Sequence, residues 1–106
     1  MAFFRRRKST TVGGRTGGRE ELAYLEDFVR TRRGVEGFIE PRTTVTQTTL
    51  LLIAHDGEWT RRRIASPDAA RQFAHRMAMP IYDIALVGYP QRMRDYNERK
   101  KRDATP

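Results

Sequence analysis

The sequence predicts a small α+β domain whose elements follow the order helix, β-hairpin, helix, strand, helix. Three patterns predict this fold: a β-branched and aliphatic run that turns back at an Asp-Gly pair, a Ser-Pro-Asp helix start, and an apolar stretch after that helix. A strand, a crossover helix and another strand form a right-handed βαβ unit with parallel strands. We therefore expect a three-stranded mixed sheet with helices packed on one or both faces.

The hairpin occupies residues 43–64 and has the strongest signal in the chain. Asp56-Gly57 suits a two-residue type I′ turn, and such a turn pairs Ala54 with Trp59. Because side chains alternate between faces and the first arm, residues 43–54, carries aliphatic residues on both faces, it is expected to be a central strand covered on both sides. In this register one face holds Thr49, Leu51, Ile53, Thr60, Arg62 and Ile64, and the other holds Leu50, Leu52, Ala54, Trp59, Arg61 and Arg63.

Three helices and a second strand complete the expected fold. Residues 20–33 have a helical apolar stripe and end at Gly34, and a second helix begins at Ser66-Pro67-Asp68 and ends before Pro80. Residues 81–89 are expected to be a strand centred on residues 84–87, and residues 91–102 a final helix, while residues 35–40 form a short linker or edge strand. The expected core consists of Leu22, Leu25, Val29, Leu51, Ile53, Ile64, Phe73, Met77, Ile84 and Leu86.

Composition limits the class of protein. The chain has 106 residues, which is enough for a single domain, and it has no cysteine for a disulfide or a thiolate metal site. His55 and His75 are too isolated to form a transition-metal site, so neither a metal nor a cofactor is expected. We also see no membrane-spanning stretch and no export signal, and therefore expect a cytoplasmic protein.

The positive charge is concentrated at the two ends of the chain. The formal net charge is +8, with +6 in residues 1–19, −1 in residues 20–89 and +3 in residues 90–106. We interpret residues 1–19 as a flexible basic arm, residues 20–98 as one α+β domain, and residues 99–106 as a basic frayed tail. Basic ends on a nearly neutral body are typical of proteins that associate with a polyanion.

RNA is the polyanion that the pattern favours. Glycines alternate with arginines in the arm, and the hairpin places an aromatic ring beside arginines on one strand face, a combination that stacks on unpaired bases. The start of the last helix adds tyrosines and further basic residues, with a phosphate position at its N-terminus. The predicted RNA-binding residues are Arg5, Arg6, Arg7, Lys8, Arg15, Arg19, Trp59, Arg61, Arg63, Tyr89, Arg92, Arg94, Arg99 and Lys100.

The residues favour a non-catalytic RNA-binding accessory protein, associated with the ribosome or another ribonucleoprotein. Two alternatives stay open. One is a protein-interaction module whose basic tails keep it in solution, with a variant in which Phe3-Phe4 and the adjacent basic cluster contact an anionic membrane surface. The other is a small metal-independent ribonuclease that uses His55 or Arg61.

Three stretches resemble a group of small basic actinobacterial proteins of unknown function. They are Trp59-Thr60-Arg61-Arg62, the segment of residues 87–96, and the arginine-rich start. The resemblance extends over residues 20–98 and implies no established activity or site. Some members carry the label oxidoreductase, but this sequence has no nucleotide-binding fingerprint, no cysteine and no flavin motif to support it.

Overall fold

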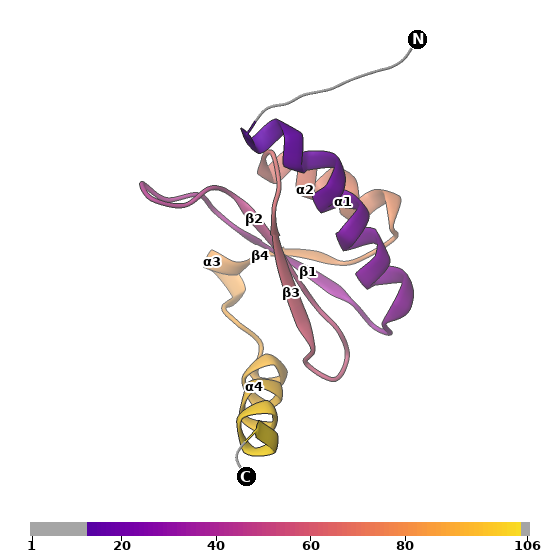
Figure 1. The fold of residues 1–106 in the computed structure, drawn as a ribbon, viewed down its shortest axis with the longest axis vertical. Coiled ribbons are helices and arrows are strands. Elements are labelled where there is room, and N and C mark those ends of the chain that lie inside the picture. The colour runs from indigo at the N-terminus through magenta and orange to yellow at the C-terminus, as the bar shows by residue number, and fades with distance from the viewer. Residues whose placement is uncertain (1–12, 105–106) are drawn as a thin grey trace.

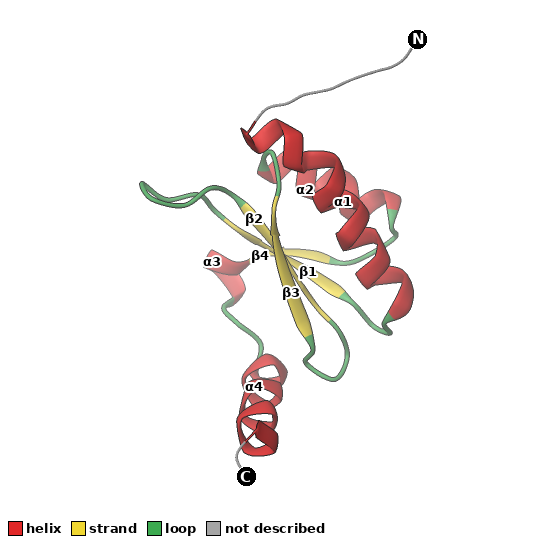
Figure 2. Cartoon of the chain, in the orientation of Figure 1, coloured by secondary structure: helices red, strands yellow, loops and turns green. Residues whose placement is uncertain are grey.

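The computed structural model describes residues 13–104 and confirms an α+β fold built on a mixed sheet. The sheet has four strands in the order β3-β2-β1-β4, one more than expected (Figure 1). Helices cover both of its faces (Figure 2). The elements are α1 (Gly13–Thr31), β1 (Glu36–Glu40), β2 (Thr49–Ile53), β3 (Trp59–Arg63), α2 (Pro67–Arg76), β4 (Ile81–Asp83), α3 (Ile84–Val87) and α4 (Gln91–Ala104).

The predicted hairpin is present as β2 and β3, but its predicted register is wrong by one residue. Ile53 pairs with Trp59, where the sequence pattern pairs Ala54 with Trp59. A type I′ turn needs positive φ at both Asp56 and Gly57, and only Gly57 has it, at φ +94. The Gly57 N–H donates to the Ala54 carbonyl and the Ala54 N–H to the Glu58 carbonyl, so the loop has three residues and closes with a bulge at Gly57.

The shifted register changes which residues of β2 and β3 share a face. Trp59, Arg61 and Arg63 lie across from Ile53, Leu51 and Thr49, so the predicted grouping of Trp59 with Leu50 and Leu52 is wrong. The aliphatic side chains of β2 are nevertheless buried on both faces. This burial confirms the expectation that β2 is a central strand.

Residues 36–40, expected in a linker or edge strand, form the interior strand β1. It pairs antiparallel with β2 and parallel with β4. β3 and β4 therefore run in the same direction, as expected for strands joined by α2, but β2 and β1 lie between them. Gly37 allows this arrangement because the N–H of Gly37 donates to the Pro80 carbonyl, and a Cβ there would lie 2.8 Å from the Met79 methyl carbon.

One face of the sheet carries α1 and α2, and this face holds the larger apolar core. Leu25 and Phe28 of α1 and Phe73 of α2 pack against Leu50 and Leu52 of β2. The start of α2 is as predicted, since the Ser66 hydroxyl accepts a hydrogen bond from the Ala69 N–H at 3.0 Å. The helix α1 begins at Gly13, earlier than the expected residue 20, and it ends before Gly34 at φ +61.

The opposite face, which we call the α4 face, is covered less completely. Its apolar cluster consists of Phe38, Leu51, Ile53 and Met93, with Trp59 and Ile84 at the margin. Met93 is the buried residue that α4 contributes, so the helix rests on a narrow apolar contact and on the polar contacts described below.

The strand predicted over residues 81–89 is wrong after Asp83. The Asp83 carboxylate accepts a hydrogen bond from the Ala85 N–H at 2.9 Å and caps α3, and Gly88 ends that helix with φ +75. The expectation that Leu86 belongs to the core is also wrong, because its side chain is 84% exposed. Apolar character alone does not bury this segment, since β4 pairs with β1 only through Asp83 and the chain then leaves the sheet.

Candidate nucleic-acid interface

The predicted Trp59 and Arg61 surface exists on β3, but its groups are already engaged within the chain. The indole Nε1 of Trp59 donates to the Asn97 side-chain oxygen of α4 at 2.8 Å. The Arg61 guanidinium lies 5.3 Å from the centre of the Trp59 ring. An aromatic ring held between a helix and an arginine presents little free surface for stacking on a base.

Glu40 is the centre of a hydrogen-bonded network on the α4 face. Its two carboxylate oxygens accept from Arg61 at 2.6 and 2.8 Å, from the Thr49 hydroxyl at 2.7 Å and from the Tyr89 hydroxyl at 2.5 Å. Burial alone would raise the pKa of the Glu40 carboxyl, but the hydrogen bonds from Arg61, Tyr89 and Thr49 outweigh this effect and lower that pKa. The same contact raises the pKa of the Tyr89 phenol. Arg61 and Tyr89, both predicted RNA contacts, therefore lie close together because both donate to Glu40. The Glu40 carboxylate also neutralises the charge of Arg61.

Arg92 is held in the same way by a second glutamate. Its Nη2 donates to Glu36 at 2.6 Å, and its Nε donates to the Ala54 carbonyl at 3.1 Å. Two turns further along α4, Arg99 donates to the Asp56 carbonyl at 2.8 Å. Arg92, the arginine at the predicted phosphate position at the start of α4, is thus directed onto the sheet and the hairpin.

The remaining predicted residues of α4 make contacts within their own helix. Arg94 donates to the Gln91 side-chain oxygen at 3.2 Å. The Lys100 ammonium lies 6.0 Å from the centre of the Tyr96 ring. Both side chains stay exposed and keep their charge accessible to solvent.

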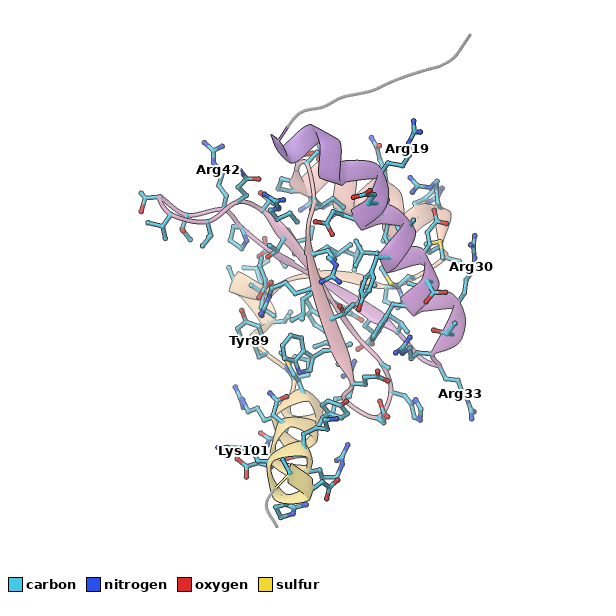
Figure 3. All side chains as sticks on the ribbon, in the orientation of Figure 1. Arg19, Arg30, Arg33, Arg42, Tyr89 and Lys101 are labelled. Atoms are coloured by element: carbon cyan, nitrogen blue, oxygen red, sulfur yellow. The ribbon has the colours of Figure 1, made fainter. Side chains whose placement is uncertain are left out.

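Arg19, Arg42 and Arg63 have neither an ion pair nor a hydrogen bond from their side chains among the described residues. Figure 3 shows Arg19 and Arg42 at the end of the molecule where α1 begins, and Arg33 and Lys101 toward the other end. Arg42 and Arg63 line one pocket together with Gly18 of α1. We call this end of the molecule, with Arg19, Arg42 and Arg63, the basic end.

The N-terminal stretch joins the molecule at the basic end, because α1 starts there. Arg5, Arg6, Arg7 and Lys8, all predicted RNA contacts, lie outside the described residues. Arg15 lies in α1, where the backbone is described but the side chain is not. Residues 1–19 contain no acidic residue, so no carboxylate side chain from this stretch can neutralise the basic end.

Two residues of this end were missed by sequence reasoning. Arg42 follows Pro41 in the connection between β1 and β2, and Thr48 immediately precedes β2. The hydroxyl-rich run from Thr43 to Thr49 was interpreted as part of a strand, whereas its first residues form a turn in which the Thr43 hydroxyl accepts from the N–H of Val45 and Thr46. One sequence feature could have pointed to this surface. Arg42 stands next to a run of threonines, and no acidic residue follows closely after Glu40.

The residues of the ribonuclease alternative are not brought together. His55 lies in the hairpin loop and its N–H donates to the Arg33 carbonyl, while Arg61 of the edge strand β3 is paired with Glu40 of β1. Within residues 13–104, no group of three or more His, Asp or Glu side chains is arranged to hold a metal ion.

Comparison with family models, with curated proteins and with solved structures finds no match for this chain. In the part of the chain that the structure describes, no helix is both long enough and apolar enough to cross a membrane.

Proposed function

We propose that this protein binds single-stranded RNA through its basic end, without catalysis. The observation that carries the proposal is that Arg19, Arg42 and Arg63 have no acidic partner among the described residues and lie at the end of the molecule where α1 begins, while residues 1–18 add a charge of +5. Arginines without internal partners can neutralise phosphates at no cost in broken ion pairs.

The contacts favour recognition of the phosphate backbone over recognition of bases. Trp59 donates to Asn97 and stacks with Arg61, and Glu40 and Glu36 neutralise Arg61 and Arg92. Phosphate contacts position a strand but carry no sequence information. We therefore expect binding with weak sequence preference, as suits an accessory protein on a ribosome or another cytoplasmic ribonucleoprotein.

The test compares two double variants in fluorescence anisotropy with a labelled single-stranded RNA. Arg42→Ala with Arg63→Ala should weaken binding about tenfold at about 0.1 M salt, because two phosphate contacts are lost. Arg33→Ala with Arg102→Ala removes the same charge from exposed arginines outside the basic end and should change the affinity less than about twofold. Equal weakening by the two variants would show a general charge effect and would contradict a localised interface.

A protein partner is the second candidate, and an exposed apolar surface around α3 favours it. Leu86 and Val87 are 84% and 55% exposed, and Tyr82 of the edge strand β4 is 40% exposed. Surfaces of this kind mark interaction sites. In a pull-down from cell lysate treated with RNase, Leu86→Asp should lose a partner that Arg42→Ala with Arg63→Ala retains. If both variants retain the same partners, this surface is not the interface.

A further inference from the structure

The pocket at the basic end has the size of a small-ligand site. Its volume is about 400 Å³, and such sites usually measure ~300–1,000 Å³. It lies between α1, the start of β2 and the end of β3. The residues that line it are Gly18, Glu21, Arg42, Gln47, Thr48, Arg63, Ile64 and Ala65.

Thr48 contributes a buried hydroxyl that has no hydrogen-bond partner among the described residues. The residue is 6% exposed, and its backbone carbonyl accepts the Ile64 N–H at 3.0 Å. Its side-chain oxygen makes no hydrogen bond to any residue whose side chain is described. Buried hydroxyls in folded proteins are nearly always hydrogen-bonded, so an unpaired one at a pocket wall is suited to a ligand that accepts a hydrogen bond.

The charge of the pocket is close to two positive units. Among the described residues Arg42 and Arg63 have no acidic partner, and the carboxylate of Glu21 is balanced at 3.2 Å by Arg62, which lies outside the pocket lining. Gln47 adds an exposed amide that can donate. A phosphate monoester carries a charge of about −1.5 to −2 at neutral pH, whereas each phosphodiester of an RNA chain carries one negative charge. The pocket therefore matches a monoester better than a diester.

We propose that this pocket binds the terminal phosphate monoester of an RNA strand. This assignment rests on the proposed RNA-binding function and adds to it a preference for one kind of strand end. Arg42 and Arg63 neutralise the terminal phosphate, and the Thr48 hydroxyl donates a hydrogen bond to it. The rest of the strand then continues toward Arg19 at the same end of the molecule.

Three RNAs of one sequence test this assignment: one with a 5′-monophosphate, one with a 3′-monophosphate, and one with hydroxyls at both ends. The protein of residues 1–106 should bind one phosphorylated RNA about fivefold to tenfold more tightly than the hydroxyl-ended RNA, since charge-assisted hydrogen bonds are the stronger class. The two phosphorylated RNAs show which end of the strand is recognised.

Variants locate the preference in the pocket. Arg42→Ala with Arg63→Ala should bring the ratio between phosphorylated and hydroxyl-ended RNA to about one. Thr48→Val keeps the shape and removes the hydroxyl, and it should reduce the ratio severalfold while the affinity for hydroxyl-ended RNA stays the same. Thr44→Val makes the same change at an exposed residue outside the pocket lining and should leave the ratio unchanged.

The outcomes separate this inference from the function on which it rests. Equal binding of all three RNAs, with affinity that falls steeply with salt, would overturn the pocket assignment and leave RNA binding intact. Absence of binding to all three RNAs would overturn both. A ratio that Arg42→Ala with Arg63→Ala leaves unchanged would place the preference elsewhere and would also overturn the assignment.

Discussion

Glu40 and Glu36 each hold one arginine on the α4 face, at N–O distances of 2.6 Å. Both arginines are predicted RNA contacts. In the structure Arg61 joins β3 to β1 within the sheet, and Arg92 joins α4 to β1. The pairs are partly buried, with hydrogen bonds from additional donors to Glu40, so they are stronger than typical surface ion pairs. A single carboxylate beside an arginine thus decides whether its charge is available to a ligand.

Glu40→Gln should make the protein less stable at neutral pH by about 1–2 kcal/mol, because hydrogen bonds to a charged acceptor become neutral ones. The pKa of Glu40 is lowered in the folded state, so its contribution is present above the ordinary pKa of 4.5 and is lost as the pH falls through the lower folded value. Urea unfolding should therefore show a difference between wild type and variant at about pH 7 that shrinks toward about pH 3. Glu98→Gln, at an exposed residue of α4, is the control and should stay within ~0.5 kcal/mol at both pH values. A difference that grows in acid would contradict the assignment.

Among the elements, the hairpin loop and α4 determine the position of each other. Gly57 has φ +94, and a Cβ on it would overlap the Arg92 carbonyl and come 2.8 Å from the Tyr96 Cβ. Arg92 and Arg99 donate to carbonyls of the same hairpin. Since α4 buries only Met93, this close backbone approach is a large part of what docks the helix.

Gly57→Ala should lower the free energy of unfolding by about 2–4 kcal/mol, because it adds backbone strain and a steric overlap. Gly88→Ala separates the two effects, since Gly88 has φ +75 but open space around its Cβ position, and it should cost only about 1–2 kcal/mol. Emission from Trp59, the only tryptophan, reports whether α4 has moved, because Trp59 donates to Asn97. Equal losses for both variants, with unchanged emission, would mean that the loop does not position α4.

Local sequence patterns predict several of the elements but not how the two hairpin strands pair. The hairpin, the Ser66 cap and the final helix follow from local chemistry, and all three were predictable. The register was not, because a two-residue and a three-residue loop both suit Asp56-Gly57, and the choice depends on the close packing against α4. The helical structure of residues 84–87 was also unpredictable, because a short apolar run suits either a strand or a helix until its neighbours in the fold are known.

At the scale of the whole molecule, the α+β class was predictable and the location of the available positive charge was not. Counting charges along the sequence cannot distinguish an arginine that faces Glu40 from one that faces solvent, because the pairing joins residues far apart in the chain. The sequence does not show that the β1–β2 connection lies beside α1, and this neighbourhood is what brings Arg42 and Thr48 into the pocket. The fold therefore separates arginines that are paired with glutamates, such as Arg61 and Arg92, from arginines such as Arg42 that have no acidic partner among the described residues.

The proposed binding of RNA at the basic end predicts how the affinity depends on salt. Each phosphate contact on a single strand lowers the slope of log K against log salt by about 0.7, because counterions are released. Removing Arg42 and Arg63 together should make the slope shallower by about 1.4, and Arg61→Ala should leave it unchanged, because Glu40 already neutralises Arg61. Titrations from about 0.05 to 0.2 M salt measure both slopes. If Arg61→Ala reduces the slope as much as Arg63→Ala does, RNA displaces Glu40 and the interface lies on the α4 face rather than at the basic end.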